Sequence, residues 1–184
     1  MKSIMHFADI GITDIPLVGG KNASLGEMYS SLSSKGIMVP EGFAVTALGY
    51  WSFLNYGNLI PALTAILSKL DVKSFNNLSE TGSLARKLIL QATFTPLLQN
   101  EITTAYRQLV LHSGTNNSFA VRSSATAEDL PAASFAGQQE TYLNVKGEKN
   151  LIKASQRCYA SLFTDRAIKY RVDNGFEHMK VALS

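Results

Sequence analysis

Two segments of the sequence combine a cationic side chain with small residues in a way that suits phosphate groups. The first is VGGKNAS, from Val18 to Ser24, in which two glycines precede Lys21. Glycines let a backbone approach a ligand closely, and the free N–H groups at the start of a following helix attract anions. The segment is not a P-loop, which would need glycine in place of Ile15 and a hydroxyl in place of Asn22. An ordinary turn into a helix with a solvated lysine explains the same residues.

The second segment is AVRSSATAED, in which Arg122 ends an apolar run that reads as a strand. A guanidinium fixed at a strand end offers a planar fork to phosphate oxygens. Ser123 and the hydroxyl residues after it add donors without bulk. A surface ion pair of Arg122 with Glu128 or Asp129 is the alternative, and such pairs contribute only about 0 to 1 kcal/mol.

A loop rich in small residues, PAASFAGQQET, separates this segment from the next apolar run. Gly137 permits close backbone approach to a ligand, and Gln138 could donate a hydrogen bond to its oxygens. A plain connection between two strands of a hairpin would have a similar composition. The sequence alone leaves this choice open.

Other reactive residues favour structural roles. Arg166 and Arg171 lie at helical spacing in CYASLFTDRAIKYR, and such cations usually form a solvated face. Cys158 falls on the apolar side of the same helix and is predicted to be a packing residue. The three histidines, His6, His112 and His178, have no zinc-ligand spacing.

The elements that position these residues follow from hydrophobic periodicity. A helix is predicted from about Asn22 to Ser34, followed by a strand in GFAVT, with Thr46 as the N-cap of a helix over Ala47 to Asn55. Three more helical patterns run from Leu59 to about His112. The region from about 57 to 112 is therefore predicted to form a helical subdomain.

After the turn-rich cluster GTNN, the segments SFAVRSS and ETYLNV read as two strands around a loop of about 13 residues. Helical spacing returns from Glu148 to about Asn174, with an interruption near Phe163 to Asp165. HMKVALS begins what reads as another apolar strand and carries no terminating signal. We expect from this that the 184 residues are a piece of a longer protein. The fold class is predicted to be α+β.

Composition excludes several classes of protein. The 46% hydrophobic content is typical of a globular core, and no run approaches the roughly 18 to 20 apolar residues of a membrane span. The excess of 17 Lys and Arg over 14 Asp and Glu is small and unclustered, so no nucleic-acid partner is predicted. A single cysteine fits a reducing compartment, and the cytoplasm is the expected location.

Taken together, four motifs carry a family resemblance. VGGKNASLGEM, VPEGFAVTA, FAVRSSATAEDLPAASFAGQQETYLNV and CYASLFTDRAIKYR are similar, in the same order, to the N-terminal nucleotide-binding region of the phosphoenolpyruvate synthase (pyruvate, water dikinase) family. The match is nearly continuous from Gly19 to Arg171. One departure is Ala132, where the family usually carries an acidic residue.

The resemblance implies the first lobe of an ATP-grasp nucleotide-binding domain. It assigns Lys21 and Arg122 to the nucleotide phosphates and places Ser123, Gly137, Gln138 and Thr141 beside them, the last three on a loop that closes over ATP. The carboxylates that bind Mg²⁺ would belong to a second lobe. In the family, the β-phosphoryl group of ATP passes to a histidine on another domain and then to pyruvate in a distant barrel.

The resemblance also implies that the full-length protein is a homodimer and that the fragment alone is inactive. None of the three histidines lies in the family's phosphohistidine motif. Three alternatives stay open. A rifampin phosphotransferase shares a nearly identical third motif, another dikinase of the PEP-utilising family would use the same ATP chemistry, and a stand-alone, non-catalytic nucleotide-binding module would need the same phosphate contacts.

Overall fold

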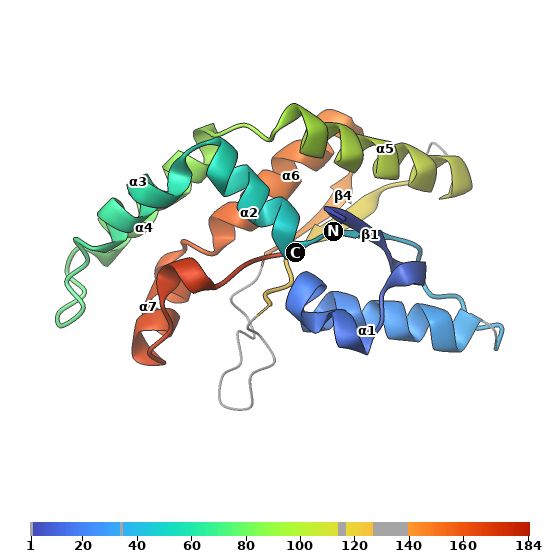
Figure 1. The fold of residues 1–184 in the computed structure, drawn as a ribbon, viewed down its shortest axis with the longest axis horizontal. Helices are drawn as coiled ribbons and strands as arrows, with labels where there is room; N and C mark the ends of the chain where they lie inside the picture. Colours follow the sequence, from blue (N-terminus) through green and yellow to red (C-terminus); the bar gives the residue numbers. More distant parts are fainter. Residues whose placement is uncertain (1, 34, 114–116, 127–139) are drawn as a thin grey trace.

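The computed structural model describes residues 2–33, 35–113, 117–126 and 140–184 of the chain. Within these ranges seven α-helices and four strands form a mixed α+β fold (Figure 1). The helices are α1 (Ile15–Ser33), α2 (Ala47–Tyr56), α3 (Leu59–Leu67), α4 (Leu78–Gln91), α5 (Pro96–Ser113), α6 (Glu148–Ser161) and α7 (Asp165–Asp173). The strands are β1 (Ile4–His6), β2 (Phe43–Val45), β3 (Phe119–Arg122) and β4 (Thr141–Val145).

The strands form two antiparallel pairs. Strand β1 pairs with β2, and β3 pairs with β4 so that Arg122 stands opposite Thr141. A further bridge joins Ala125, just beyond β3, to Leu183 near the end of the chain. These short strand pairings therefore connect segments that are far apart in sequence.

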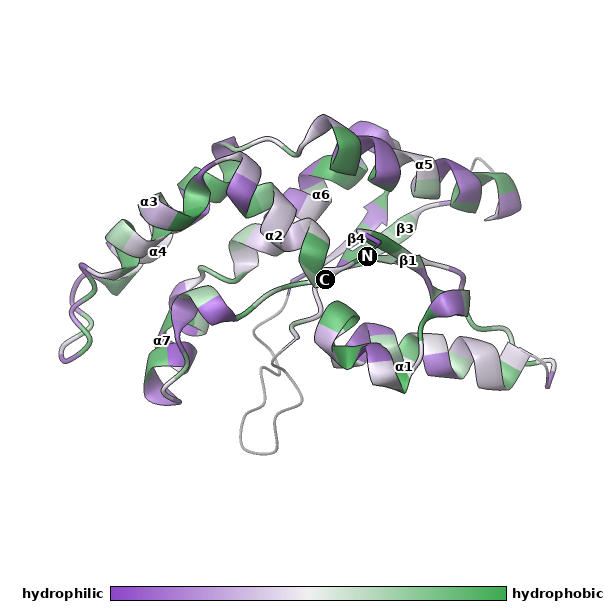
Figure 2. Cartoon of the chain, in the orientation of Figure 1, coloured by the Kyte–Doolittle hydropathy of each residue, from purple (hydrophilic) through white to green (hydrophobic). Residues whose placement is uncertain are grey.

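Helices cover both sides of the strands. Figure 1 shows α1 below them and α5 and α6 above, with α2, α3, α4 and α7 extending to one side. Helices α3, α4, α5 and α6 carry bands of hydrophobic and hydrophilic residues along their length (Figure 2), as expected for helices with one face on a core.

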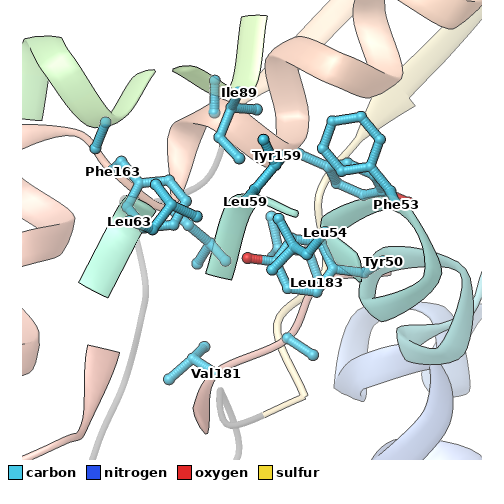
Figure 3. Close-up of a cluster of buried hydrophobic side chains, with 14 of the residues drawn as sticks. Tyr50, Phe53, Leu54, Leu59, Leu63, Ile89, Tyr159, Phe163, Val181 and Leu183 are labelled. Atoms are coloured by element: carbon cyan, nitrogen blue, oxygen red, sulfur yellow. The ribbon is translucent and has the colours of Figure 1, made fainter. Parts of the chain in front are cut away.

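The main core is built around aromatic side chains. Tyr159 of α6 packs edge to face against Tyr50 of α2, with 5.0 Å between ring centroids, and lies 5.3 Å from the ring of Phe53. Phe94 packs against Phe53 at 4.8 Å. The same cluster includes Leu183 (Figure 3), so the last residues of the chain belong to the core of the helical part. A smaller cluster lies between α1 and the β1–β2 pair.

Most predicted elements are present. The strand in GFAVT is β2, the strands around Arg122 are β3 and β4, and the helix predicted from Glu148 is interrupted after Ser161. Thr46 precedes α2 as predicted, but its hydroxyl does not cap the helix. It donates instead to the carbonyl of Lys2, at 3.0 Å, and so ties α2 to the segment before β1.

Two boundary predictions were wrong. Helix α1 begins at Ile15 rather than Asn22, and a break at Gly19 divides it. Pro16 lies in its first turn, where a missing N–H and a fixed φ are tolerated. The strand predicted in HMKVALS is shorter than expected: the residues His178–Lys180 form a 3₁₀ helix, and pairing with the segment after β3 begins only at Ala182.

The solvated face predicted for Arg166 and Arg171 was wrong for Arg171. Arg166 is exposed, but Arg171 is fully buried on the inner side of α7, where its Nε donates to Nδ1 of His178 at 3.0 Å. Burial lowers the pKa of Arg171 to about 10, so the guanidinium keeps its charge at neutral pH. A helical arginine is ambiguous in sequence, because the same spacing suits an inward and an outward face.

Candidate functional site

The candidate site begins at the break in α1. Gly19 has φ 72° and ψ 163°, a conformation almost confined to glycine. A Cβ at this position would lie 2.3 Å from Oγ of Ser124 and 2.8 Å from the carbonyl oxygen of Ala125. Glycine is therefore required at this position for two reasons: its backbone angles and its close contact with the segment that follows β3. The contact brings the two segments singled out in the sequence against each other.

Asn22 fastens the restarted helix to the rest of the site. Its Nδ2 donates to the carbonyl of Val18 and to Oγ of Ser184, both at 3.0 Å. Ser184 in turn exchanges two backbone hydrogen bonds of 2.8 Å with Ser124. Three stretches, around Gly19, Ser124 and Ser184, thus hold one another in place.

The end of β3 presents Arg122 toward α1. Residues directly opposite each other in an antiparallel pair project to the same face, so the exposed side chains of Arg122 and Thr141 lie side by side. Alternation along an extended strand puts Ser124 on that same face, where Gly19 covers it. The start of the restarted helix, with Lys21, therefore borders the sheet face that carries Arg122 and Thr141.

Ser123 points the other way. It is buried, and its N–H donates to the carbonyl of Glu140 at 3.3 Å, so its backbone donor is already used within the sheet. The hydroxyls of Ser123 and Ser124 are buried and have no hydrogen-bond partner among the described residues. Gly137 and Gln138, also predicted to contact the ligand, lie outside the described residues.

The structure adds residues that the sequence did not single out. Asn22 and Ser184 connect positions 162 residues apart, and no local pattern announces such a hydrogen bond. The only signal for Asn22 was its place directly after Gly-Gly-Lys. Ser124 had been noted for its hydroxyl, whereas in the structure its backbone and its contact with Gly19 matter most.

A pocket of about 590 Å³ lies next to this site and reaches Arg122, Asn22 and Ser184. Its walls are mainly apolar and come from β2, β3, α1, α5 and α6. Lys21 and Thr141 are not part of its lining, so the pocket shares Arg122 with the cationic face described above but extends away from the other two residues of that face.

Cys158 lines the pocket and is buried, as predicted for a packing residue. Burial, with a smaller effect from Glu140, raises the pKa of its thiol to about 12, so almost no thiolate forms at neutral pH. Burial and the raised pKa both fit a packing residue rather than a nucleophile. Among the described residues no group of three or more His, Cys, Asp or Glu side chains is placed to bind a metal ion. No helix in the described ranges has the length and apolarity to cross a membrane.

Comparison with known proteins agrees with the resemblance seen in the motifs. Residues 15–184 match the family described as the pyruvate phosphate dikinase, AMP/ATP-binding domain. The chain is 51% identical to phosphoenolpyruvate synthase of Synechocystis over 186 aligned positions, 51% identical to that of Pseudomonas aeruginosa over 184, and 48% identical to that of Escherichia coli over 181. These alignments cover 98%, 100% and 98% of the chain.

In each case the alignment covers 23% of the relative, so the chain spans about a quarter of the length of these proteins. The family match includes Gly19, Lys21, Arg122, Thr141 and Ser184, the residues around which the site is built. The chain belongs to the pyruvate phosphate dikinase AMP/ATP-binding domain family.

Proposed function

We propose that this chain is the first ATP-grasp lobe of a phosphoenolpyruvate synthase and that it holds the phosphates of ATP between α1 and the end of β3. The proposal rests above all on the contact of Gly19 with Ser124 and Ala125, which joins the Gly-Gly-Lys segment to the Arg122 segment. The phosphoenolpyruvate synthases to which the chain is about half identical support the same function.

The proposed site combines three kinds of phosphate-binding group. Arg122 offers a guanidinium fork on the open face of the β3–β4 pair, and Thr141 stands beside it with a hydroxyl. The N-terminal end of the restarted helix and the side chain of Lys21 add positive potential from the neighbouring wall. Gly137 and Gln138 are assigned to the nucleotide from the family motif, and Ser123 contributes by positioning Arg122.

These groups suit phosphoryl transfer, which needs positioning and charge neutralisation more than covalent chemistry from the protein. In the proposed reaction, ATP gives its β-phosphoryl group to a histidine of another domain, pyruvate receives that group to become phosphoenolpyruvate, and the γ-phosphoryl group goes to water. AMP and inorganic phosphate are the other products. This chain would bind and orient ATP for the first transfer.

We propose that Mg²⁺ is bound by parts of the full-length protein that lie outside this chain. Among the described residues no three or more carboxylate, imidazole or thiol side chains are grouped to form a metal site. We assign the metal ligands to the second lobe and the phosphohistidine and pyruvate sites to further domains. A cytoplasmic homodimer without a nucleic-acid or membrane partner is the state proposed for the full-length protein.

The test is replacement of Arg122 by Ala in the full-length protein, with pyruvate-dependent formation of AMP from ATP as the readout. Loss of a guanidinium that neutralises transferring phosphates should lower kcat/KM about 100-fold or more. Arg107→Ala is the matched control, because Arg107 is an exposed arginine whose Nε donates to Glu148 at 2.7 Å on the opposite helical layer. It should keep near-normal turnover.

Equal turnover in the Arg122 and Arg107 variants would reduce Arg122 to a structural residue. An unmodified full-length protein that consumes ATP only with rifampin, and not with pyruvate, would identify a rifampin phosphotransferase instead. Nucleotide binding without any turnover would support the non-catalytic module.

A further inference from the structure

We propose that one more β-strand occupies the pocket between β2 and β3. This strand is formed by the residues that directly follow Ser184 in the full-length protein. The inference rests on the proposed function only in so far as it takes the chain to be part of a longer protein, as the fourfold greater length of its relatives suggests. The occupant is thus a segment of the same polypeptide.

The hydrogen bonds beyond β3 define where this strand would run. Ser123 donates its N–H to Glu140 on the β4 side, whereas Ser124 exchanges both backbone hydrogen bonds with Ser184. Successive N–H groups of an extended chain point to opposite edges, so Ser184 lies on the edge of β3 that faces away from β4. Thr126 continues the pattern by donating to Ala182 at 3.1 Å.

The register of this ladder leads into the pocket. Ala125 pairs with Leu183 in antiparallel orientation, so a chain that continues beyond Ser184 advances along β3 toward Phe119. The residues of β3, from Phe119 to Arg122, and Ser184 itself line the pocket. Continuation of the existing ladder therefore fills the pocket without any change of direction.

The opposite wall of the pocket is also a strand edge. Within the part of the chain that the structure describes, β2 pairs only with β1 and β3 only with β4. Both strands line the pocket, as do Asn22 and Leu25 of α1 on one side and Leu151 and Cys158 of α6 on the other. The pocket thus passes through the strand layer, from the helix on one face to the helices on the other.

A strand satisfies this environment better than a small molecule does. The N–H and C=O groups of Ala120 and Arg122 point to the open edge, and such an unpaired strand edge is a template for one more strand. One added strand would pair with them, cover the apolar walls and turn the two hairpin-like pairs into a single sheet. Adjacent strands need only about 4.8 Å of spacing, so a single insertion bridges two edges.

The register gives a direct test by disulfide cross-linking in the full-length protein. Ala125 stands opposite Leu183, so in this antiparallel register the residue numbers of every facing pair add up to 308. Val121 therefore stands opposite the third residue after Ser184. This pair does not exchange hydrogen bonds, and its expected Cα separation of about 4.5 Å suits a disulfide. Val121→Cys is combined with cysteine at that third position, in a Cys158→Ala background.

The control couples Val121→Cys with cysteine at the second residue after Ser184, whose side chain should project to the other face. Under mild oxidation the aligned pair should form an intramolecular disulfide in about tenfold higher yield than the displaced pair. Equal yields, or a higher yield in the displaced pair, would overturn the proposal. A disulfide between two chains would identify a second copy as the occupant instead.

Hydrogen exchange in the unsubstituted full-length protein provides the second measurement, because a cysteine variant could fail to fold. At single-residue resolution, the amides of Ala120 and Arg122 should be as protected as that of Val121, which points toward β4. Rapid exchange at Ala120 and Arg122 beside a protected Val121 would disprove the strand. Protection that appears only when ATP is added would make the pocket a ligand site.

The assay of AMP formation on the same preparations separates the two proposals. A protein that turns over pyruvate and ATP but forms no aligned disulfide refutes the strand alone. A protein that forms the disulfide and shows no pyruvate-dependent turnover refutes the proposed reaction alone.

Discussion

At the scale of single residues, Gly19 sets the geometry of the candidate site. Replacement by Ala forces a strained φ and drives a methyl group into Ser124, so we expect a loss of about 3 kcal/mol in the free energy of unfolding. Gly36→Ala is the control, because Gly36 also has a positive φ, 78°, but nothing lies within 4 Å of the position that a Cβ would take there. It should cost about 1 kcal/mol.

Chemical denaturation of both variants checks this difference. The excess cost at Gly19 measures the contact with the segment after β3 together with any additional strain of its φ 72°, ψ 163° conformation. Equal losses would show that the contact contributes nothing to stability.

His178 should make the free energy of unfolding depend on pH. Burial, and then the neighbouring Arg171, lower the pKa of His178 to about 4, compared with about 6.5 in an unfolded chain. Between these values the unfolded state binds the proton more readily, so stability is complete above pH 6.5 and falls as pH decreases toward 4. Because the imidazole is only half-buried, we expect a loss of about 1 to 2 kcal/mol.

A His178→Gln variant isolates this contribution from that of the carboxylates. Glutamine can still accept a hydrogen bond from Arg171 but does not titrate. The stability difference between the two proteins should change between pH 7 and pH 5, and a constant difference would contradict the depressed pKa.

At the scale of elements, the hydroxyl of Thr46 joins α2 to the segment before β1. Thr46 is fully buried, and its N–H also donates to the carbonyl of Ser3 at 2.8 Å. Thr46→Val leaves the carbonyl of Lys2 without its donor and should cost about 1 to 2 kcal/mol. Thr64→Val is the control, since the hydroxyl of Thr64 is exposed and bonds only within its own helix. Thermal unfolding should barely distinguish that control from the parent protein.

Sequence periodicity predicted the existence of most elements but not their ends. Apolar spacing identified β2, β3, β4 and the helices from α2 to α7, because these patterns are local. The break in α1 escaped prediction because the angles of Gly19 depend on Ser124, more than 100 residues away. The inward orientation of Arg171 escaped for the same reason: helical spacing does not tell which face of α7 meets the core.

The residues of the candidate site also divide into those that local sequence patterns predicted and those that they did not. Lys21 and Arg122 were found from their motifs, and the structure places their segments in contact. The connections through Asn22 and Ser184 could not be predicted, since they join residues separated by nearly the whole chain.

At the scale of the whole molecule, Leu183 links the site to the helical core. It is 1% exposed, packs in the cluster that contains Tyr50 and Tyr159, and pairs through its backbone with Ala125. Leu183→Ala should therefore lower the free energy of unfolding by about 3 kcal/mol, as expected for a buried leucine. It should also weaken ATP binding, because the strand opposite Ala125 loses its anchor.

Leu143→Ala provides the comparison, because Leu143 is 68% exposed on β4. That variant should stay within about 0.5 kcal/mol of the parent protein. Calorimetry on both variants, with nucleotide titration of the same samples, would contradict the anchoring role if stability fell at Leu183 without any change in ATP affinity.

The hydrogen bond between Asn22 and Ser184 also has a consequence for synthesis on the ribosome. Its partners are 162 residues apart, and at 5 to 20 residues per second the second partner is made about 8 to 32 s after the first. During that interval α1 has emerged while the strand that fastens it does not yet exist. Among the described elements the phosphate-binding face is therefore completed after the seven helices, so a nascent chain should gain these helices before it gains affinity for nucleotide.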